Sequence, residues 1–270
     1  MRLIIAFFVL IMPLEAYAEE LVNKDESLTL ERCIEIALKK HPSVVAAKHS
    51  IDVNQNKIGE AKSNYYPQLS SISGYNRYWD GLSDQNYSTA LSLNQNIYDF
   101  GKTTSQVNIQ KFNLNAAQAD LENTSDLVIF NVSQGYYTVL KNKRNRDVAQ
   151  ETVAQFDHHL KQAKGFYQAG TRAKFDVTRA EVDLSNSKLN LIKAENALRL
   201  AKVSLNNAIG LPYAPEYRIE DNLDFAKYAL PLEEAIERAY NNRADLQSLL
   251  AKKKAATESI ELAKKGYYPT

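Results

Sequence analysis

Residues 65–102 read YYPQLSSISGYNRYWDGLSDQNYSTALSLNQNIYDFGK, and this stretch differs in character from the rest of the chain. Up to Tyr98 its only charged residues are Arg77, Asp80 and Asp84, which lie around Gly81. Charges and a glycine are typical of a loop, so the charge-poor flanks are predicted to be the two strands of a β-hairpin over 68–98. Of the chain's 16 Tyr and one Trp, seven lie here, as an aromatic belt at a membrane surface would require.

The second strand of this hairpin has one apolar and one polar face. Every second residue is mainly apolar along the face of Tyr87, Leu91, Leu93 and Ile97, and serines and asparagines lie opposite. The first strand is less regular, because Leu69 and Ile72 are out of phase. About 12 residues per strand is close to the 9–11 that cross a bilayer, so we predict that the apolar face meets lipid. An amphipathic hairpin packed on a soluble core fits the alternation equally well.

The N-terminus has the pattern of a secretory signal peptide over residues 1–18. Arg2 precedes an uncharged run from Leu3 to Leu14, and Ala16-Tyr17-Ala18 places small residues around the expected cleavage site. The apolar run is about 12 residues long, whereas a membrane-spanning helix needs about 20. We therefore expect an exported protein.

Most of the remaining chain is predicted to be helical. Helices are expected over 28–66, over 102–168, where there is no proline, and over 173–208. In the last of these, two heptad series predict a left-handed coiled coil: Val177, Leu184, Leu191, Leu198 and Leu205, and Ala173, Ala180, Ser187, Ala194, Ala201 and Ala208. Between the helices at 102–168 and 173–208, Gly170 is predicted to take the left-handed conformation that ends the first helix. Thr171 is predicted to help cap the second helix, and Asp176 to interact favourably with the dipole in its first turns.

An internal repeat organises the chain. Leu28–Gln68 aligns without gaps to Leu230–Thr270, and 12 of the 41 positions are identical at a constant offset of 202 residues. Ordinary residue usage gives about two or three identities by chance. We predict a tandem duplication in which 19–229 is the first repeat, with an equatorial segment at 211–229. Residues 230–270 then begin a second repeat that is incomplete by about 160 residues.

Composition argues against several classes of function. The 33 Lys+Arg balance 32 Asp+Glu, which gives nucleic acid no basic surface to bind. With one Cys and four His, the chain has few of the residues that usually bind metals. The adjacent His158 and His159 would point in different directions on a helix and would not share a metal ion. We found no nucleophile motif or paired-carboxylate site, and we predict neither an enzyme nor a bound cofactor.

Three motifs together resemble the TolC family of outer membrane efflux proteins. They are a helix that ends in Tyr65-Tyr66-Pro67-Gln68, the junction Asn96-Ile97-Tyr98-Asp99-Phe100-Gly101-Lys102, and Gly170-x5-Asp176-x3-Ala180-x3-Leu184 followed by a Leu/Ala helix that ends at Ile209-Gly210-Leu211-Pro212. The resemblance implies a mainly α fold with a β-hairpin. Long antiparallel coiled-coil helices would form a periplasmic α-barrel, and the strands would join a transmembrane β-barrel when three protomers assemble.

The same resemblance implies a function and partners. A homotrimer would lie in the outer membrane lipid of a Gram-negative cell, and it would conduct substrates outward in a tripartite efflux or type I secretion system. It would dock with a periplasmic adaptor protein and an inner-membrane transporter. Gly170 and Thr171 would lie at the periplasmic tip that meets the adaptor, and Asp176 would be a tip acid that helps to hold the pore closed.

Two alternatives remain at this stage. A soluble periplasmic coiled-coil module of adaptor type would explain the export signal and the heptads. A non-conducting fragment of a channel would explain the incomplete repeat, because three copies with two strands each give six, fewer than the eight of the smallest bacterial barrels.

Overall fold

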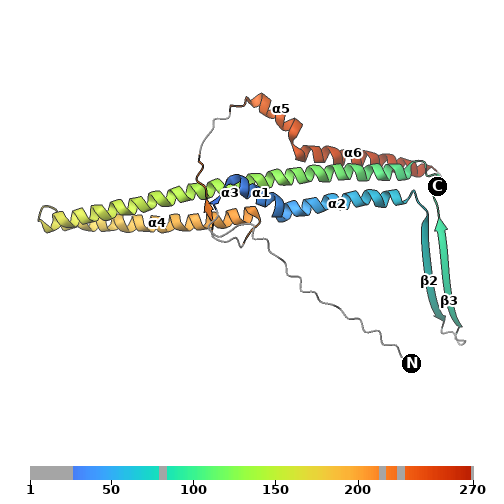
Figure 1. Ribbon diagram of the computed structural model, residues 1–270, viewed down its shortest axis with the longest axis horizontal. Coiled ribbons are helices and arrows are strands. Elements are labelled where there is room, and N and C mark those ends of the chain that lie inside the picture. Colours follow the sequence, from blue (N-terminus) through green and yellow to red (C-terminus); the bar gives the residue numbers. More distant parts are fainter. Residues whose placement is uncertain (1–26, 79–83, 213–216, 224–228, 269–270) are drawn as a thin grey trace.

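The computed structural model describes residues 27–78, 84–212, 217–223 and 229–268. The predicted signal peptide at 1–18 lies outside these ranges, as does part of the segment at 211–229. Within them the molecule is an elongated bundle of helices with a two-stranded hairpin projecting from one end (Figure 1).

The longest element is helix α3, Lys102–Gln168, whose 67 residues have the bounds predicted from the lack of proline. At 1.5 Å per residue it is about 100 Å long. Helix α4, Lys174–Ile209, runs back along its distal part (Figure 1). The contact seam on α4 uses both heptad series, and its buried members are Ala180, Leu184, Ser187, Ala201 and Leu205. Alternation of small and large residues along this seam brings the two helices close together.

The single helix predicted over 28–66 is wrong, because the structure has two helices there. Helix α1 is Leu30–Lys40 and helix α2 is Pro42–Ser63, with His41 extended between them at φ −60° and ψ 127°. A residue before proline is driven out of the helical region, so Pro42 ends α1 and begins α2. The Thr29 hydroxyl caps α1 by accepting from the Arg32 N–H at 3.2 Å.

The main core lies where α1 crosses α3 and α4. Helix α1 contributes Cys33, Ile36 and Ala37, and the other buried members include Val128, Val132, Tyr136, Val139, Leu140, Leu205 and Ile209. Burial raises the pKa of the Cys33 thiol to about 11, so the thiol stays protonated and acts as a small apolar side chain.

The last two helices of the described chain repeat the α1–α2 pair. Helix α5, Leu232–Asn242, and helix α6, Ala244–Lys264, break at Arg243, which lies 202 residues after His41. Helix α6 packs along α3, where Lys252 Nζ lies 3.0 Å from Asp120 Oδ2, and a 3₁₀ turn, η1, follows at Lys265–Tyr267 (Figure 1). Helix α5 differs from α1 in that none of its residues is buried.

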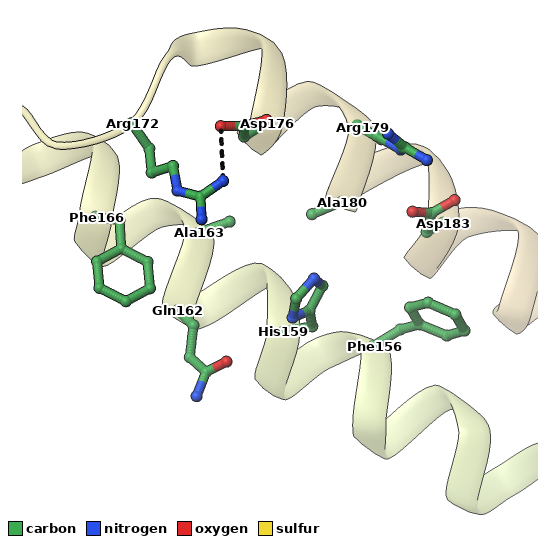
Figure 2. Close-up of a pocket in the computed structure, with 10 residues that line it drawn as sticks. All are labelled: Phe156, His159, Gln162, Ala163, Phe166, Arg172, Asp176, Arg179, Ala180 and Asp183. Carbon is green, nitrogen blue, oxygen red and sulfur yellow. Dashed lines mark ion pairs between the residues drawn. The ribbon is translucent and has the colours of Figure 1, made fainter.

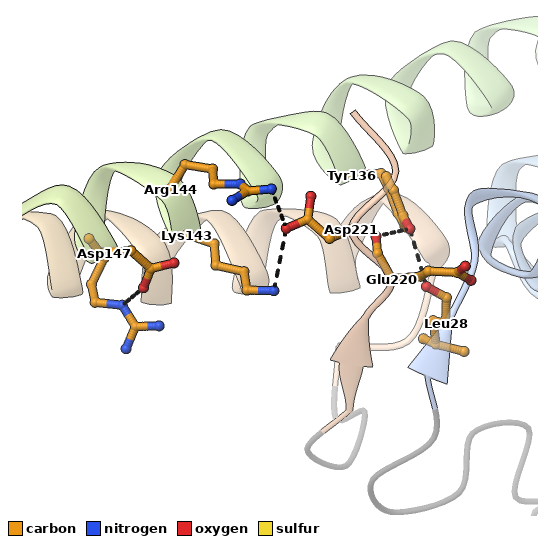
Figure 3. Close-up of polar contacts among 8 residues, drawn as sticks. Leu28, Tyr136, Lys143, Arg144, Asp147, Glu220 and Asp221 are labelled. Atoms are coloured by element: carbon orange, nitrogen blue, oxygen red, sulfur yellow. Dashed lines mark hydrogen bonds and ion pairs between the residues drawn. The ribbon is translucent and has the colours of Figure 1, made fainter. Parts of the chain in front are cut away.

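A short belt crosses the middle of α3. Strand β1, Ser27–Leu28, pairs in parallel with strand β4, Arg218–Ile219. The buried Tyr136 hydroxyl donates to the Glu220 carbonyl at 2.7 Å and lies 3.3 Å from the Leu28 carbonyl (Figure 3). About two turns further along α3, Asp221 Oδ2 lies 2.9 Å from the Arg144 guanidinium. These contacts hold the segment between the two repeats against the helix.

The hairpin consists of strands β2, Gln68–Tyr78, and β3, Asp84–Asn94. They are antiparallel, and the ladder runs from Gln68 opposite Asn94 to Tyr78 opposite Asp84. The expected end at residue 98 is therefore four residues too far. Among the described helices, none is both long enough and apolar enough to cross a bilayer.

Two glycines are expected to respond to alanine with opposite signs. Gly210→Ala should lower the free energy of unfolding by about 1–2 kcal/mol, because Gly210 has a φ of +85° and a Cβ there would lie 3.0 Å from the His41 Cα. Gly165→Ala should raise it by up to about 1 kcal/mol, because Gly165 lies inside α3 and a Cβ there meets no atom within 4 Å. Urea unfolding followed by helicity measures both changes, and shifts of the same sign would contradict this account.

Candidate functional site at the hairpin, its junction and the helical tip

The strand register gives the hairpin two chemically different faces. One face carries the cross-strand pairs Leu69–Leu93, Ser71–Leu91, Ser73–Thr89 and Tyr75–Tyr87. The other carries Ser70–Ser92, Ile72–Ala90, Gly74–Ser88 and Asn76–Asn86. Leu69 lies on the first face and Ile72 on the second, which accounts for the irregular pattern of the first strand.

The apolar face is open to its surroundings. Tyr87, Leu91 and Leu93 are between 67 and 74% exposed, and no helix of the described chain covers them. The tyrosine pair Tyr75–Tyr87 has its ring centroids 4.8 Å apart. Within the described residues β2 and β3 pair only with each other, so each strand has an outer edge without a strand partner. This geometry suits a surface that meets an apolar medium and further strands.

Ile97 does not belong to the apolar strand face, which corrects the prediction. The ladder stops at Gln68 because Pro67 precedes it, and proline has no N–H to donate. Beyond Asn94 the chain turns away, and the Gln95 side chain donates to the Asn96 carbonyl at 2.8 Å. Ile97 is 96% exposed in this connecting segment.

The junction from the hairpin into α3 is fixed by Asp99. Its carboxylate accepts from the Gly101 N–H at 2.9 Å and from the Thr103 N–H at 2.7 Å. Phe100 and Gly101 both have positive φ, 52° and 78°, which turns the chain sharply into the helix. This role of Asp99 is not among the predictions from the sequence, although an acid just before a long helical segment is a recognised capping signal.

The far end of the bundle is a tight turn between α3 and α4. Gly170 has a φ of +73°, as expected of a residue that ends a helix. The prediction that Thr171 caps the next helix is wrong, because its hydroxyl donates back to the Phe166 carbonyl at 2.9 Å. The N-cap of α4 is Ala173, which makes no side-chain cap. Asp176 lies in the first turn of α4, 3.7 Å from the Arg172 guanidinium.

A groove of about 330 Å³ lies beside this turn, between α3 and α4. Figure 2 shows Arg172 reaching toward Asp176, and His159 between the two helices. The lining residues supply aromatic rings and charges of both signs: Phe156, His159, Gln162, Ala163, Phe166, Arg172, Asp176, Arg179, Ala180 and Asp183. Such a surface suits contact with another helix better than a small ligand. The described residues contain no cluster of three potential metal ligands.

Comparison with known proteins shows the family. The sequence profile described as "Outer membrane efflux protein" matches residues 33–211, which is more than half of the chain. Outer membrane protein TolC of Vibrio cholerae is 24% identical over 244 residues, which cover 87% of this chain and 54% of that protein. Outer membrane efflux protein BepC of Brucella suis is 24% identical over 188 residues, covering 64% of this chain and 39% of that protein.

Solved structures have the same fold at lower identity. CusC matches with a TM-score of 0.74 at 17% identity, over 88% of this chain and 57% of CusC. VceC of Vibrio cholerae matches with a TM-score of 0.70 at 17% identity, over 88% of this chain and 59% of VceC.

The chain belongs to the outer membrane efflux protein family, whose members resemble TolC and are not enzymes. This membership places the protein in the outer membrane of a Gram-negative cell, with a large periplasmic helical part. The chain spans about half the length of the curated relatives that it matches.

Leu91→Arg should reduce assembly of the protein into the outer membrane. Arginine at the lipid midplane costs roughly 2–4 kcal/mol, and Leu91 lies on the apolar face. Ser92→Arg is the matched control, because the neighbouring residue points to the polar face, and we expect nearly normal assembly. Quantification of each variant in outer membrane fractions tests the assignment. A lower yield of Ser92→Arg would show that the faces are reversed, and equal yields would show that neither face meets lipid.

Asp99→Ala should destabilise α3 by about 1 kcal/mol near neutral pH, because the cap is lost. Hydrogen bonds, first that from the Thr103 side chain, lower the pKa of the Asp99 carboxyl below its ordinary 3.8. The stabilisation by the ionised Asp99 is therefore complete above pH 3.8, the ordinary pKa of the carboxyl in the unfolded chain. It is lost as the pH falls through the lower pKa of the folded state. Urea unfolding of both proteins near pH 7 and near pH 2 should show a difference at neutral pH only. A difference of the same size at both would contradict the charged cap.

Proposed function

We propose that this chain is a subunit of an outer membrane channel that passively conducts substrates out of the cell, in a tripartite efflux or type I secretion system. Family membership supports the outer membrane and efflux part of the proposal. No covalent chemistry is required of the subunit. Its physical task is to hold a water-filled path through lipid.

The observation that carries the proposal is the two-faced hairpin. Each strand has 11 residues, and at about 3.4 Å per residue and a tilt of about 40° it covers roughly 28 Å. That length matches the hydrocarbon thickness of a bilayer, about 30 Å. One face has the larger apolar side chains, in the pairs Leu69–Leu93 and Tyr75–Tyr87 and at Leu91, and suits lipid. The other face is mainly Ser, Gly and Asn, apart from the Ile72–Ala90 pair, and suits a wet lumen.

The helices support assembly into a homotrimer with a periplasmic tube. Four large apolar residues of α4 are exposed at heptad positions: Phe175, Val182, Leu189 and Val203, with Asn196 at the position between the last two. An exposed, mainly apolar heptad stripe of this kind suits further helices packed against it. In a ring of subunits, neighbouring protomers would supply those helices.

The turn at Gly170 and the groove beside it are the proposed contact for a periplasmic adaptor protein, which would link the channel to an inner-membrane transporter. The groove is lined by residues close to the α3–α4 turn. That turn is at the end of the bundle farthest from the hairpin (Figure 1). Thr171 stabilises the turn, while Asp176 and Arg172 place a carboxylate and a guanidinium beside it. Asp176 remains our proposed tip acid for the closed pore.

Cell fractionation with conductance measurement tests the proposal. We expect protein from the intact gene to fractionate with the outer membrane as trimers that dissociate on heating. Free periplasmic protein would instead support the adaptor-like module. Purified trimers should give reproducible single-channel steps in planar bilayers. Trimers in the outer membrane without such steps would support the non-conducting fragment.

A further inference from the structure

The junction between the hairpin and the helices is rich in lysines and aromatic residues. We define the junction collar as residues 62–68, 95–105 and 264–268, which come together where α2, α3 and α6 meet the strands (Figure 1). It has one carboxylate, Asp99, against four lysines, Lys62, Lys102, Lys264 and Lys265. It also has six aromatic residues, Tyr65, Tyr66, Tyr98, Phe100, Tyr267 and Tyr268. The collar therefore combines a net positive charge with aromatic rings.

Two of these lysines are held by neutral oxygens. Lys265 Nζ donates to the Gly101 carbonyl at 3.1 Å and is 2.6 Å from Ser105 Oγ. Lys102 Nζ donates to the Tyr268 carbonyl at 3.3 Å. No salt bridge found in the described ranges includes either ammonium. An ammonium has three N–H donors, so Lys265 keeps one and Lys102 keeps two for another acceptor.

The only carboxylate of the collar is already engaged. Asp99 accepts from two backbone N–H groups at the start of α3, as described above. Among the collar lysines, Lys264 has a carboxylate partner: its ammonium lies 2.8 Å from Glu261, which is outside the collar. The charges of Lys102 and Lys265 thus have no anionic partner within salt-bridge distance in the described chain, and both side chains are only partly exposed.

Aromatic rings pack together at the same junction, and Lys102 donates to the backbone carbonyl of one of these residues, Tyr268. Phe100 stacks on Tyr268 with centroids 5.4 Å apart, and Tyr98 packs edge-on against Phe100 at 4.7 Å. Tyr98 and Tyr267 are 71% and 92% exposed. Tyrosines beside lysines are typical of proteins at the headgroup level, where the ring bodies meet acyl chains and the ammonium groups reach phosphates.

We propose that Lys102 and Lys265 bind the phosphate of an anionic phospholipid in the periplasmic leaflet of the outer membrane. The inference rests on the proposed function, because that function puts β2 and β3 across the bilayer. Strands that cover roughly 28 Å end close to the headgroups, and the collar follows directly on those ends. Charge complementarity and continuity with the apolar hairpin favour a lipid over a soluble anion.

Native mass spectrometry of the detergent-purified protein, titrated with phosphatidylglycerol, tests the site. The double variant Lys102→Gln/Lys265→Gln should bind this lipid about 25-fold more weakly, because each lysine near an anionic headgroup contributes about fivefold. Lys102→Arg/Lys265→Arg should retain most of the binding. The matched control is Lys253→Gln/Lys254→Gln, which removes the same charge from exposed positions of α6 and should bind like the wild type.

Four results would overturn the lipid site. Unchanged phosphatidylglycerol binding by the glutamine variant would remove it directly. Equal loss in the arginine variant would show that the lysines act through structure, and equal loss in the α6 control would show that only total charge matters. Full competition by millimolar inorganic phosphate would make it a site for free anions. Protein found free in the periplasm would instead count against the proposed function, so the two failures are distinguishable.

Discussion

The backbone groups on the outer edges of the β2–β3 hairpin need hydrogen-bond partners, and this requirement governs the rest of the structure. In hydrocarbon no water can satisfy them, and each unpaired N–H or C=O costs several kcal/mol. In the described chain the two strands pair only with each other. If the hairpin crosses the bilayer as proposed, its two open edges require further strands beside it. The subunit becomes stable in lipid only by adding strands on both sides.

The helical part also has a surface that needs further partners, here apolar side chains rather than backbone groups. A helix of about 100 Å cannot fold back on itself, so α3 is covered in sections, by α2 and α6 near the strands and by α4 at the far end. The belt held by Tyr136 and Asp221 lies between these sections. Coverage by one chain still leaves the Phe175–Val203 stripe of α4 exposed. The hairpin and the helical bundle thus both have surfaces suited to further subunits.

How much the sequence predicts depends on whether a feature is local. The bounds of α3 follow from a proline-free stretch between two glycine turns, which are local signals. The α1–α2 break is also a local feature, because Pro42 disfavours helix at His41; the helical composition on both sides hides this break in the sequence pattern. Thr171 was misassigned because a hydroxyl beside two helix ends can serve either one, and only the geometry decides. Lys265 reaches the Gly101 carbonyl 164 residues away, a contact that periodicity and spacing do not encode.

The duplication shows how one helical pattern can serve two environments. Helices α1 and α5 have the same length and break at equivalent places, yet Ile36 in α1 is 2% exposed while its counterpart in α5 is Arg238, which pairs with Glu234. An arginine cannot replace a buried isoleucine in an apolar core without a large desolvation cost. The surface that receives α5 must therefore differ from the one that receives α1. The two repeats share a backbone plan, but their helices have diverged to meet different neighbours.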